Sequence, residues 1–368
     1  MRILCLIQCS DLGGMEQSTL LFLRELQAMG HEPEMISLNP VGKLGPKLKQ
    51  HGIPVSSSGY EGKWGWKSYL PLRRLLGGKR PDALVMVGHN LMASLAIGNL
   101  CAGRRIMDIR FHHQGVLSNR AWQIIYRVAY PRFKAITFPT RFIMEEAMAI
   151  CPFLKEAPVG KCHKMPFPVV LAEVATPEQK RQARADLGLP EGIKLVGNAG
   201  WLVDRKRMDV FLSVAQLVLK QVPEARFVIA GDGPLKETLR RQAADLGIAD
   251  KVLWLGWQQE LGAFYDSLDV LLFNSDWDSM GRTPLEAMSQ GIPVVASVVH
   301  GGLKEVISRE EYGFLIDTHD IDRLAAHVTQ ILQDDALAAR MSQAGRARIA
   351  EVGSPRKYAE AMLALLNP

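Results

Sequence analysis

The sequence has few of the features that mark secreted, metal-binding or membrane-spanning proteins. It holds five cysteines in 368 residues, an odd number without metal-ligand spacing. This count argues against a disulfide framework or a zinc site and indicates reduced thiols in the cytoplasm. No apolar run is long enough to cross a bilayer. The apolar opening, residues 1–7, is too short for a signal peptide and predicts a buried strand.

Internal repeats, low-complexity tracts and nucleic-acid-binding motifs are also absent from the sequence. We therefore expect no metal, no cofactor and no nucleic-acid partner. The composition, 48% hydrophobic and 22% charged, is that of a globular protein with material for two cores.

The net charge of +6 is unevenly distributed, since residues 1–180 hold 23 Lys and Arg against 13 Asp and Glu. Attraction of this half to an anionic membrane or acceptor would account for the excess, and so would a well-solvated surface.

Both halves alternate short aliphatic runs with longer amphipathic segments, which is typical of βαβ units with parallel sheets. We expect an N-terminal Rossmann-like domain over 1–170, a C-terminal one over 171–353, and a helix over 354–368 that packs back on the first. Doubly wound sheets bind ligands at the carboxyl ends of their strands. The expected strands are 2–7, 34–38, 83–87, 105–110, 135–138, 194–199, 226–230, 251–255, 270–273, 293–296 and 313–315, and the main helices 16–29, 121–130, 207–220, 234–246 and 284–289.

A polar turn after the strand 270–273 is the most informative segment of the chain. Thr283-Pro284-Leu285-Glu286 predicts a helix start with Thr283 as N-cap and Glu286 completing a capping box. The amides of such a turn and the helix dipole favour an anion such as a diphosphate. Asp278 and Glu286 flank the turn and suit the hydroxyls of a sugar or ribose. The turn thus predicts binding of a nucleotide-activated sugar.

An ordered series of motifs in the second half resembles the nucleotide-sugar domain of retaining glycosyltransferases of family 4, which have the GT-B fold. The series consists of Gly231-Asp232-Gly233-Pro234, Leu255-Gly256, Asp278 with Glu286, Gly291-Ile292-Pro293, Gly301-Gly302, Glu305 and Gly313. Gly13-Gly14 extends it more weakly into the first half. The resemblance implies an α/β fold of the GT-B type, with two Rossmann-like doubly wound domains facing a central cleft.

The resemblance also implies which residues bind the donor. Glu286 would hold the ribose, Asp278 and the following amides the sugar, Lys206 the departing diphosphate, and the backbone near Trp257 the base. The implied donor residues are Gly13, Gly14, Gly200, Arg205, Lys206, Gly233, Trp257, Asp278, Ser279, Met280, Gly281, Arg282, Thr283 and Glu286.

The chain departs from the family pattern at three places. Trp201 replaces the usual arginine after Gly200, and the sequence leaves open whether Arg205 or Arg207 takes over its role or the site is weakened. Asp278 replaces a glutamate, and Ser279-Met280 replaces a common Gly-Phe pair. Such changes bear on which sugar is accepted.

Candidate residues in the first domain follow the strand 105–110. The family usually has a histidine or arginine here, so Arg110, His112 and His113 are candidate catalytic residues beside Lys206 and Asp278. Adjacent side chains point in opposite directions, so only one histidine should face the cleft, with His112 preferred. His89 is a lesser candidate on the acceptor side.

Aromatic and basic residues alternate over 63–67, which is typical of a membrane interface and of an ordinary basic loop.

The resemblance implies a cytoplasmic enzyme, associated peripherally with the membrane if the basic half binds it. It would transfer a hexose-type sugar with retention, from a UDP-sugar rather than a GDP-sugar, to a glycan, a glycolipid or a small-molecule acceptor. Lipopolysaccharide or other cell-surface polysaccharide synthesis is the expected context. Two alternatives stay open: a nucleotide-sugar-binding protein that has lost catalysis, and a nucleotide-sugar epimerase.

Overall fold

The computed structural model describes residues 1–8, 13–61, 66–110, 113, 116–156, 158, 160–190, 192–297 and 301–367. Predictions for His112 and for residues 63–65 lie outside these ranges. The described chain divides into two compact units: unit 1 holds Met1–Pro168 with Gly353–Pro368, and unit 2 holds Val169–Val352. The boundary expected at 170/171 differs from this division by two residues.

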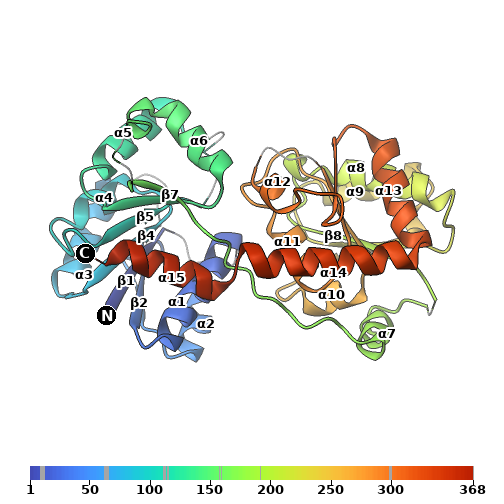
Figure 1. Cartoon of the computed structure of the whole chain (residues 1–368), viewed down its shortest axis with the longest axis horizontal. Coiled ribbons are helices and arrows are strands. Elements are labelled where there is room, and N and C mark those ends of the chain that lie inside the picture. Colours follow the sequence, from blue (N-terminus) through green and yellow to red (C-terminus); the bar gives the residue numbers. More distant parts are fainter. Residues whose placement is uncertain are drawn as a thin grey trace. The chain divides into compact units, whose positions relative to one another are not determined.

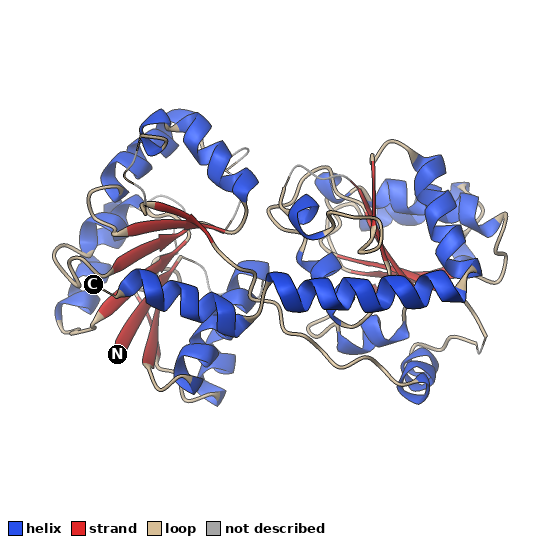
Figure 2. Ribbon diagram, viewed as in Figure 1, coloured by secondary structure: helices blue, strands red, loops and turns tan. Residues whose placement is uncertain are grey.

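Unit 1 is a parallel sheet of seven strands in the order β3-β2-β1-β4-β5-β6-β7, with helices on its faces (Figures 1 and 2). Its strands are β1 (Arg2–Ile7), β2 (Glu32–Ser37), β3 (Val55–Ser57), β4 (Ala83–Val87), β5 (Arg105–Asp108), β6 (Ala135–Phe138) and β7 (Cys162–Lys164). Its longer helices are α1 (Gly14–Ala28), α2 (Leu44–Gln50), α3 (Tyr69–Gly77), α4 (Leu91–Ala96), α5 (Asn119–Ala129), α6 (Arg141–Ile150) and α15 (Pro355–Leu366).

Unit 2 is a parallel sheet of six strands in the order β10-β9-β8-β11-β12-β13. Its strands are β8 (Leu195–Ala199), β9 (Arg226–Ala230), β10 (Val252–Gly256), β11 (Val270–Phe273), β12 (Val294–Ser297) and β13 (Phe314–Ile316). Its helices are α7 (Pro177–Asp186), α8 (Met208–Leu219), α9 (Lys236–Asp245), α10 (Gly262–Ser267), α11 (Arg282–Ser289), α12 (Leu303–Val306), α13 (Ile321–Gln333) and α14 (Asp335–Val352).

The predicted fold class is confirmed, because each unit is a Rossmann-like parallel α/β sheet. The eleven expected strands form within two residues of their predicted ends. The sequence reading missed β3 and β7, which are three residues long and half-buried, so they lack the continuous apolar run that marks a central strand.

The C-terminal helix α15 packs against α1 in unit 1, as the ribbon shows (Figure 1). The ring of Tyr358 meets Phe22 edge-on with centroids 5.3 Å apart, and Met362 and Leu366 are fully buried. Each buried side chain of this size contributes roughly 1.5–3 kcal/mol, so the helix is an integral part of the unit 1 core.

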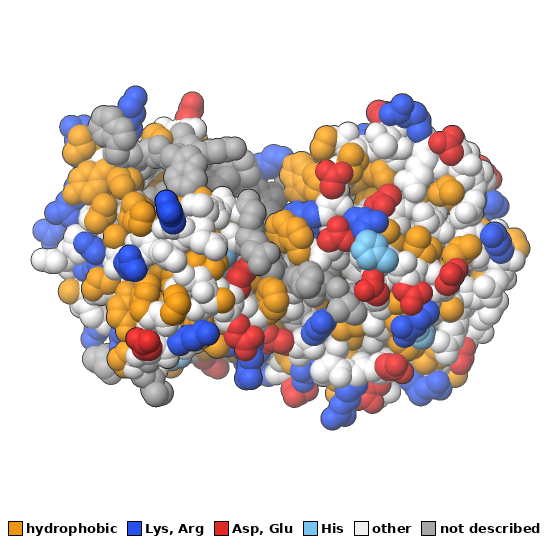
Figure 3. All heavy atoms as spheres, turned by 90° about the horizontal axis from the view of Figure 1, so that it is seen from above, with side chains coloured by type: hydrophobic (Ala, Val, Ile, Leu, Met, Phe, Trp, Pro, Cys, Tyr) orange, Lys and Arg blue, Asp and Glu red, His pale blue; other side chains and the backbone are white. Residues whose placement is uncertain are grey.

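The charge imbalance seen in the sequence follows the two units. Unit 1 holds 24 Lys and Arg against 12 Asp and Glu, and unit 2 holds 20 against 26. On the face drawn in Figure 3, acidic side chains are correspondingly more frequent over unit 2. Within the described ranges, no helix combines the length and apolar character that a bilayer crossing requires.

Candidate functional site

The winding of the unit 2 sheet reverses between β8 and β11. From β8 the chain adds β9 and β10 on one side, and then β11, β12 and β13 on the other. Ligands of open α/β sheets bind outside the carboxyl ends of the strands at such a switch point. The loops after β8 and β11 carry Lys206 and Asp278, two of the residues predicted to bind the donor.

Lys206 and Asp278 form an ion pair at this switch point, with the Lys206 Nζ 2.6 Å from Oδ2 of Asp278. The lysine is only 8% exposed, and its ammonium also lies 5.0 Å from the ring centroid of Phe273. Burial pushes the pKa of Asp278 upward, but the Lys206 charge and the amide of Gly281 outweigh it, so its pKa lies below the ordinary value. Asp278 is therefore ionised at neutral pH.

The turn after Asp278 is closed by its own carboxylate. Oδ1 of Asp278 accepts hydrogen bonds from the amides of Met280 and Gly281, at 3.4 and 3.2 Å. Ser279 contributes its carbonyl, which accepts from the amide of Gly302 at 3.1 Å. Two of the amides predicted to hold sugar hydroxyls thus have an internal acceptor in this state.

The helix start after this turn differs from the prediction. Helix α11 begins at Arg282, its N-cap is Gly281 with φ of 73°, and no side chain caps it. The predicted capping box is wrong: the Thr283 hydroxyl donates to the carbonyl of Ala199 at 3.3 Å. Glycine tolerates the left-handed backbone at this point, so the helix can begin two residues earlier than a Thr283 cap would allow.

Glu286 therefore has its carboxylate available for other contacts. Its Oε1 accepts from Nε of Arg282 at 2.5 Å, and its Oε2 accepts from the hydroxyl of Tyr265 at 2.8 Å. Tyr265 is 2% exposed, and burial together with the Glu286 charge raises its pKa well above the ordinary value, so the phenol keeps its proton.

Glycines let the loops after β8 and β9 approach closely. A Cβ on Gly231 would lie 1.9 Å from the carbonyl oxygen of Gly200, and one on Gly233, at φ of 157°, 2.6 Å from that of Leu202. Side chains at these positions would force the two loops apart. The predicted residues Gly200 and Gly233 thus shape the site through their backbone.

The cations predicted to replace the missing arginine have different contacts. The guanidinium of Arg205 lies 4.8 Å from the ring centroid of Trp277. Arg207, at φ of 46°, forms ion pairs with Asp209 at 3.0 Å and Asp276 at 3.1 Å. Arg205 is therefore the better placed of the two to reach an anion without breaking an ion pair.

Trp201 and Trp257 lie together at the carboxyl edge of the sheet, with ring centroids 4.9 Å apart and planes at 47°. Trp257 was predicted near the base, whereas no binding role was predicted for Trp201. The only signal for Trp201 was its position in place of the family arginine.

Unit 1 has its own switch point between β1 and β4, and Gly13, Gly14 and His89 follow these strands. Gly14 begins α1. The amide of Gly13 donates to Oε2 of Glu16 at 3.0 Å, so a carboxylate already occupies the position predicted for an anion.

Arg110 is corrected from a cleft residue to a buried structural one. Its Nε lies 2.5 Å from Oδ2 of Asp108, and its other nitrogens donate to the hydroxyls of Tyr358 at 2.7 Å and Thr19 at 3.1 Å. With its side chain 8% exposed, this network fastens α15 and α1 to β5.

His113 is corrected in the same way, since it is completely buried. Its Nδ1 lies 2.9 Å from Oε2 of Glu146, and its Nε2 lies 2.6 Å from the hydroxyl of Tyr126. Both ring nitrogens are occupied inside unit 1, which leaves none for a substrate. The preferred candidate, His112, lies outside the described residues.

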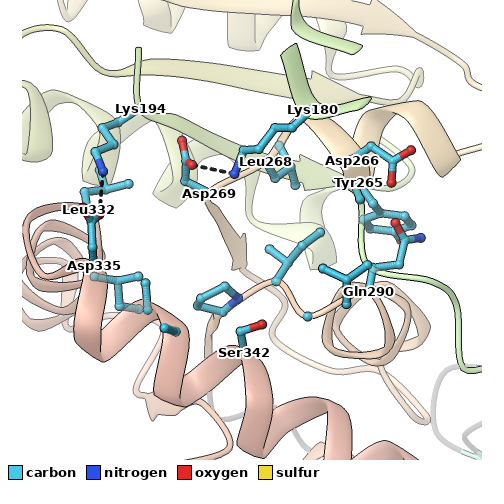
Figure 4. A pocket seen from close by; sticks show the side chains of 18 residues that line it. Lys180, Lys194, Tyr265, Asp266, Leu268, Asp269, Gln290, Leu332, Asp335 and Ser342 are labelled. Carbon is cyan, nitrogen blue, oxygen red and sulfur yellow. Dashed lines mark hydrogen bonds and ion pairs between the residues drawn. The ribbon is translucent and has the colours of Figure 1, made fainter. Parts of the chain in front are cut away.

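A cavity of about 280 Å³ opens at the opposite, amino-terminal edge of the unit 2 sheet (Figure 4). Two ion pairs line it, Lys180 with Asp269 at 2.7 Å and Lys194 with Asp335 at 3.0 Å. It therefore lies away from the loops that carry Lys206 and Asp278. Across the described ranges, no group of three or more His, Cys, Asp or Glu side chains could hold a metal ion.

Comparison with known proteins identifies the family of this chain. The model for "Glycosyl transferases group 1" matches residues 179–348, and that for "Glycosyltransferase Family 4" matches residues 12–156. The chain belongs to the family 4 glycosyltransferases of the GT-B fold. The first model covers the Lys206–Asp278 pair and the α11 turn.

Curated relatives match over parts of their length. The lipopolysaccharide core biosynthesis mannosyltransferase LpsB of Rhizobium meliloti is 30% identical over 51% of this chain and 56% of its own length. The poly(ribitol-phosphate) α-N-acetylglucosaminyltransferase of Staphylococcus aureus is 29% identical over 47% and 35%. The chain thus spans about a third to just over a half of these relatives.

Among solved structures, Anabaena Alr3699/HepE in complex with UDP aligns with a TM-score of 0.81 over 100% of this chain and 99% of its own. A glycosyltransferase from Rickettsia africae aligns with a TM-score of 0.82 over 99% and 97%. At 18% and 16% identity, these likenesses establish the GT-B fold alone.

Proposed function

We propose that the protein is a retaining glycosyltransferase that moves a hexose-type sugar from a nucleoside-diphosphate sugar to an acceptor hydroxyl. The observation that carries the proposal is the switch point of unit 2, where Lys206 pairs with Asp278 and Arg282 pairs with Glu286. Diphosphate oxygens would replace the carboxylates on the two cations, and the released carboxylates would accept hydrogen bonds from sugar and ribose hydroxyls. Without a ligand, the carboxylate of each pair neutralises the cation of the same pair.

The chemistry requires little beyond binding and charge stabilisation. The acceptor oxygen bonds to the anomeric carbon on the face from which the diphosphate leaves, the carbon–oxygen bond to the phosphate breaks, and the acceptor proton passes to the leaving phosphate. Lys206 stabilises the negative charge that grows on that phosphate, a contribution that rises in the transition state.

The donor is proposed to be a UDP-sugar rather than a GDP-sugar, and the acceptor a glycan, a glycolipid or a small molecule. The printed names of relatives include lipopolysaccharide core enzymes and GDP-mannose-dependent mannosyltransferases, which support a role in cell-surface glycan synthesis without fixing the sugar. The basic excess of unit 1 supports an anionic acceptor and peripheral contact with the cytoplasmic face of a membrane. Vesicle binding at low salt tests the membrane contact. The protein should bind anionic vesicles and should not bind neutral ones.

The donor site is tested by thermal stabilisation with UDP, GDP, ADP, UDP-glucose and GDP-mannose, without added metal. One nucleotide series should raise the melting temperature, and Glu286→Ala should abolish the shift. The exposed Glu224→Ala serves as a matched control that keeps it. If no nucleotide raises the melting temperature of the parent protein or of the Glu224→Ala control, the donor assignment fails. Stabilisation without any sugar turnover would favour a binding protein that has lost catalysis, for which Trp201 in place of the family arginine is the one supporting feature.

A further inference from the structure

Two exposed tryptophans, Trp201 and Trp257, lie in the loops after β8 and β10 and form an aromatic pair. Trp201 is 52% exposed and Trp257 is 41% exposed, whereas the large side chains of the unit 2 core are almost completely buried. Leaving two indoles in water forgoes the stabilisation that their burial would bring. Such an exposed pair beside a proposed ligand site indicates a contact surface for that ligand.

The backbone brings the two rings together across an intervening strand. β9 lies between β8 and β10. The loop after β9 contains Gly231 and Gly233, whose lack of side chains lets it lie close to the loop after β8. The amide of Leu202 donates to the carbonyl of Asp232 at 2.9 Å, which places the β8 loop directly on the β9 loop. Trp201 therefore reaches over the β9 loop to the end of β10.

The end of β10 is shaped to present Trp257. The pairing register of β10 with β9 shifts between Trp254 and Gly256, and Gly256 has φ of 67°. A bulge of this kind redirects the side chain that follows it. The centroid separation of 4.9 Å leaves no room for a third ring between the indoles, so a flat ligand must stack on their outer surface.

We propose that the Trp201–Trp257 pair is a stacking platform for the nucleobase of the donor, with Trp201 at the position where the family has an arginine. This inference rests on the proposed function. The Lys206–Asp278 pair fixes the diphosphate at the β8–β11 crevice, and β10 lies two strands from β8, about 10 Å away. A nucleotide held by its phosphates at that crevice and running toward β10 brings its base to the two indoles.

The test separates base contact from phosphate contact. Binding of uridine, UDP, GDP, glucose and pyrophosphate is measured by quenching of tryptophan fluorescence and by calorimetry, for the unsubstituted protein and for Trp201→Leu and Trp257→Leu. Leucine keeps an apolar side chain but offers no flat face. Each variant should lose roughly 5- to 150-fold in affinity for uridine and UDP, the range found for base–aromatic stacking, and keep its affinity for pyrophosphate.

Trp254→Leu is the matched control, because Trp254 lies on β10, three residues before Trp257, and packs its ring against the unit 2 core near Arg240. A second variant, Trp201→Arg, restores the family residue and should make UDP binding more salt-dependent while weakening uridine binding. Its outcome does not depend on how well the leucine variants fold.

Equal losses for UDP and pyrophosphate, or no loss for uridine, would overturn the platform while leaving the donor site intact. Quenching by glucose but not by uridine would also overturn it, because the pair would then bind sugar. If the unsubstituted protein binds none of the nucleotides, the proposed function itself fails, which is a different result from failure of the platform.

Discussion

The ammonium of Lys206 lies 2.6 Å from the carboxylate of Asp278, although the two residues belong to loops that follow different strands. The contact closes the crevice between β8 and β11 with a pair of opposite charges. In the proposed function, a diphosphate that binds there displaces the carboxylate from the lysine, and the displaced carboxylate accepts hydrogen bonds from sugar hydroxyls. The proposal therefore couples donor binding to the release of Asp278 through one ion pair.

Gly231→Ala should disrupt the site without touching any predicted side chain. Its Cβ would lie 1.9 Å from the carbonyl oxygen of Gly200, so the β8 loop must move at a cost of roughly 1–3 kcal/mol. We expect UDP affinity to fall at least about tenfold, measured by calorimetry. Gly262→Ala, whose Cβ meets no heavy atom within 4 Å, is the control and should bind normally. Unchanged binding by Gly231→Ala would show that the two loops do not shape the site.

Tyr265→Phe removes the hydroxyl that donates to Glu286 at 2.8 Å and keeps the buried ring. A hydrogen bond to a charged group contributes about 1.5–3 kcal/mol, so Glu286 should become less well positioned and UDP affinity should fall severalfold. Tyr312→Phe, in the same unit, is the matched control. If Tyr265→Phe binds UDP as tightly as the parent protein, the tyrosine does not position Glu286 for the ribose.

Tyr358→Phe should weaken unit 1 and leave nucleotide binding in unit 2 unchanged. The lost hydroxyl contacts Asp108 at 2.5 Å and Arg110 at 2.7 Å, and its removal leaves buried charges with one partner fewer. We expect a loss of about 1.5–3 kcal/mol, seen as faster hydrogen exchange along α15. A loss of donor affinity with normal exchange would contradict this and return Arg110 to the list of ligand contacts.

His89 should titrate near pH 4, because burial and the nearby His113 lower its pKa from 6.5 to about 4. Between these values the unfolded chain binds a proton that the folded chain does not. Above pH 6.5 His89 is neutral in both states and costs no stability. As the pH falls from 6.5 to about 4, the free energy of unfolding decreases by about 3 kcal/mol. Imidazole resonances followed by NMR measure the pKa, and His89→Gln identifies the signal. A midpoint near 6.5 would contradict the buried environment.

The central strands and the turn after Asp278 could be predicted from the sequence, because both depend on short-range patterns. The aliphatic runs predicted the central strands, and the spacing from Asp278 to Glu286 predicted a turn that leads into a helix. Gly281 was identified as a donor residue, but its role as the N-cap was not, because threonine is the stronger general N-cap signal.

The roles of Arg110 and His113 could not be predicted from their local sequence. Arg110 donates to Tyr358, 248 positions away, and His113 contacts Glu146 on α6, so only the packing of distant helices decides that both are buried. The Trp201–Trp257 pair likewise depends on the order β10-β9-β8 in the sheet, which the sequence did not specify.

The most direct test of the account is release of nucleoside diphosphate from the sugar donor identified by thermal stabilisation. The parent protein should release it measurably, if slowly, with water as acceptor. Lys206→Met should be about 100-fold slower or worse, since the charge that stabilises the leaving phosphate is gone. Lys220→Met, an exposed lysine of the same unit, should match the parent. Equal rates for Lys206→Met and the parent would contradict the assignment of this crevice as the site of sugar transfer.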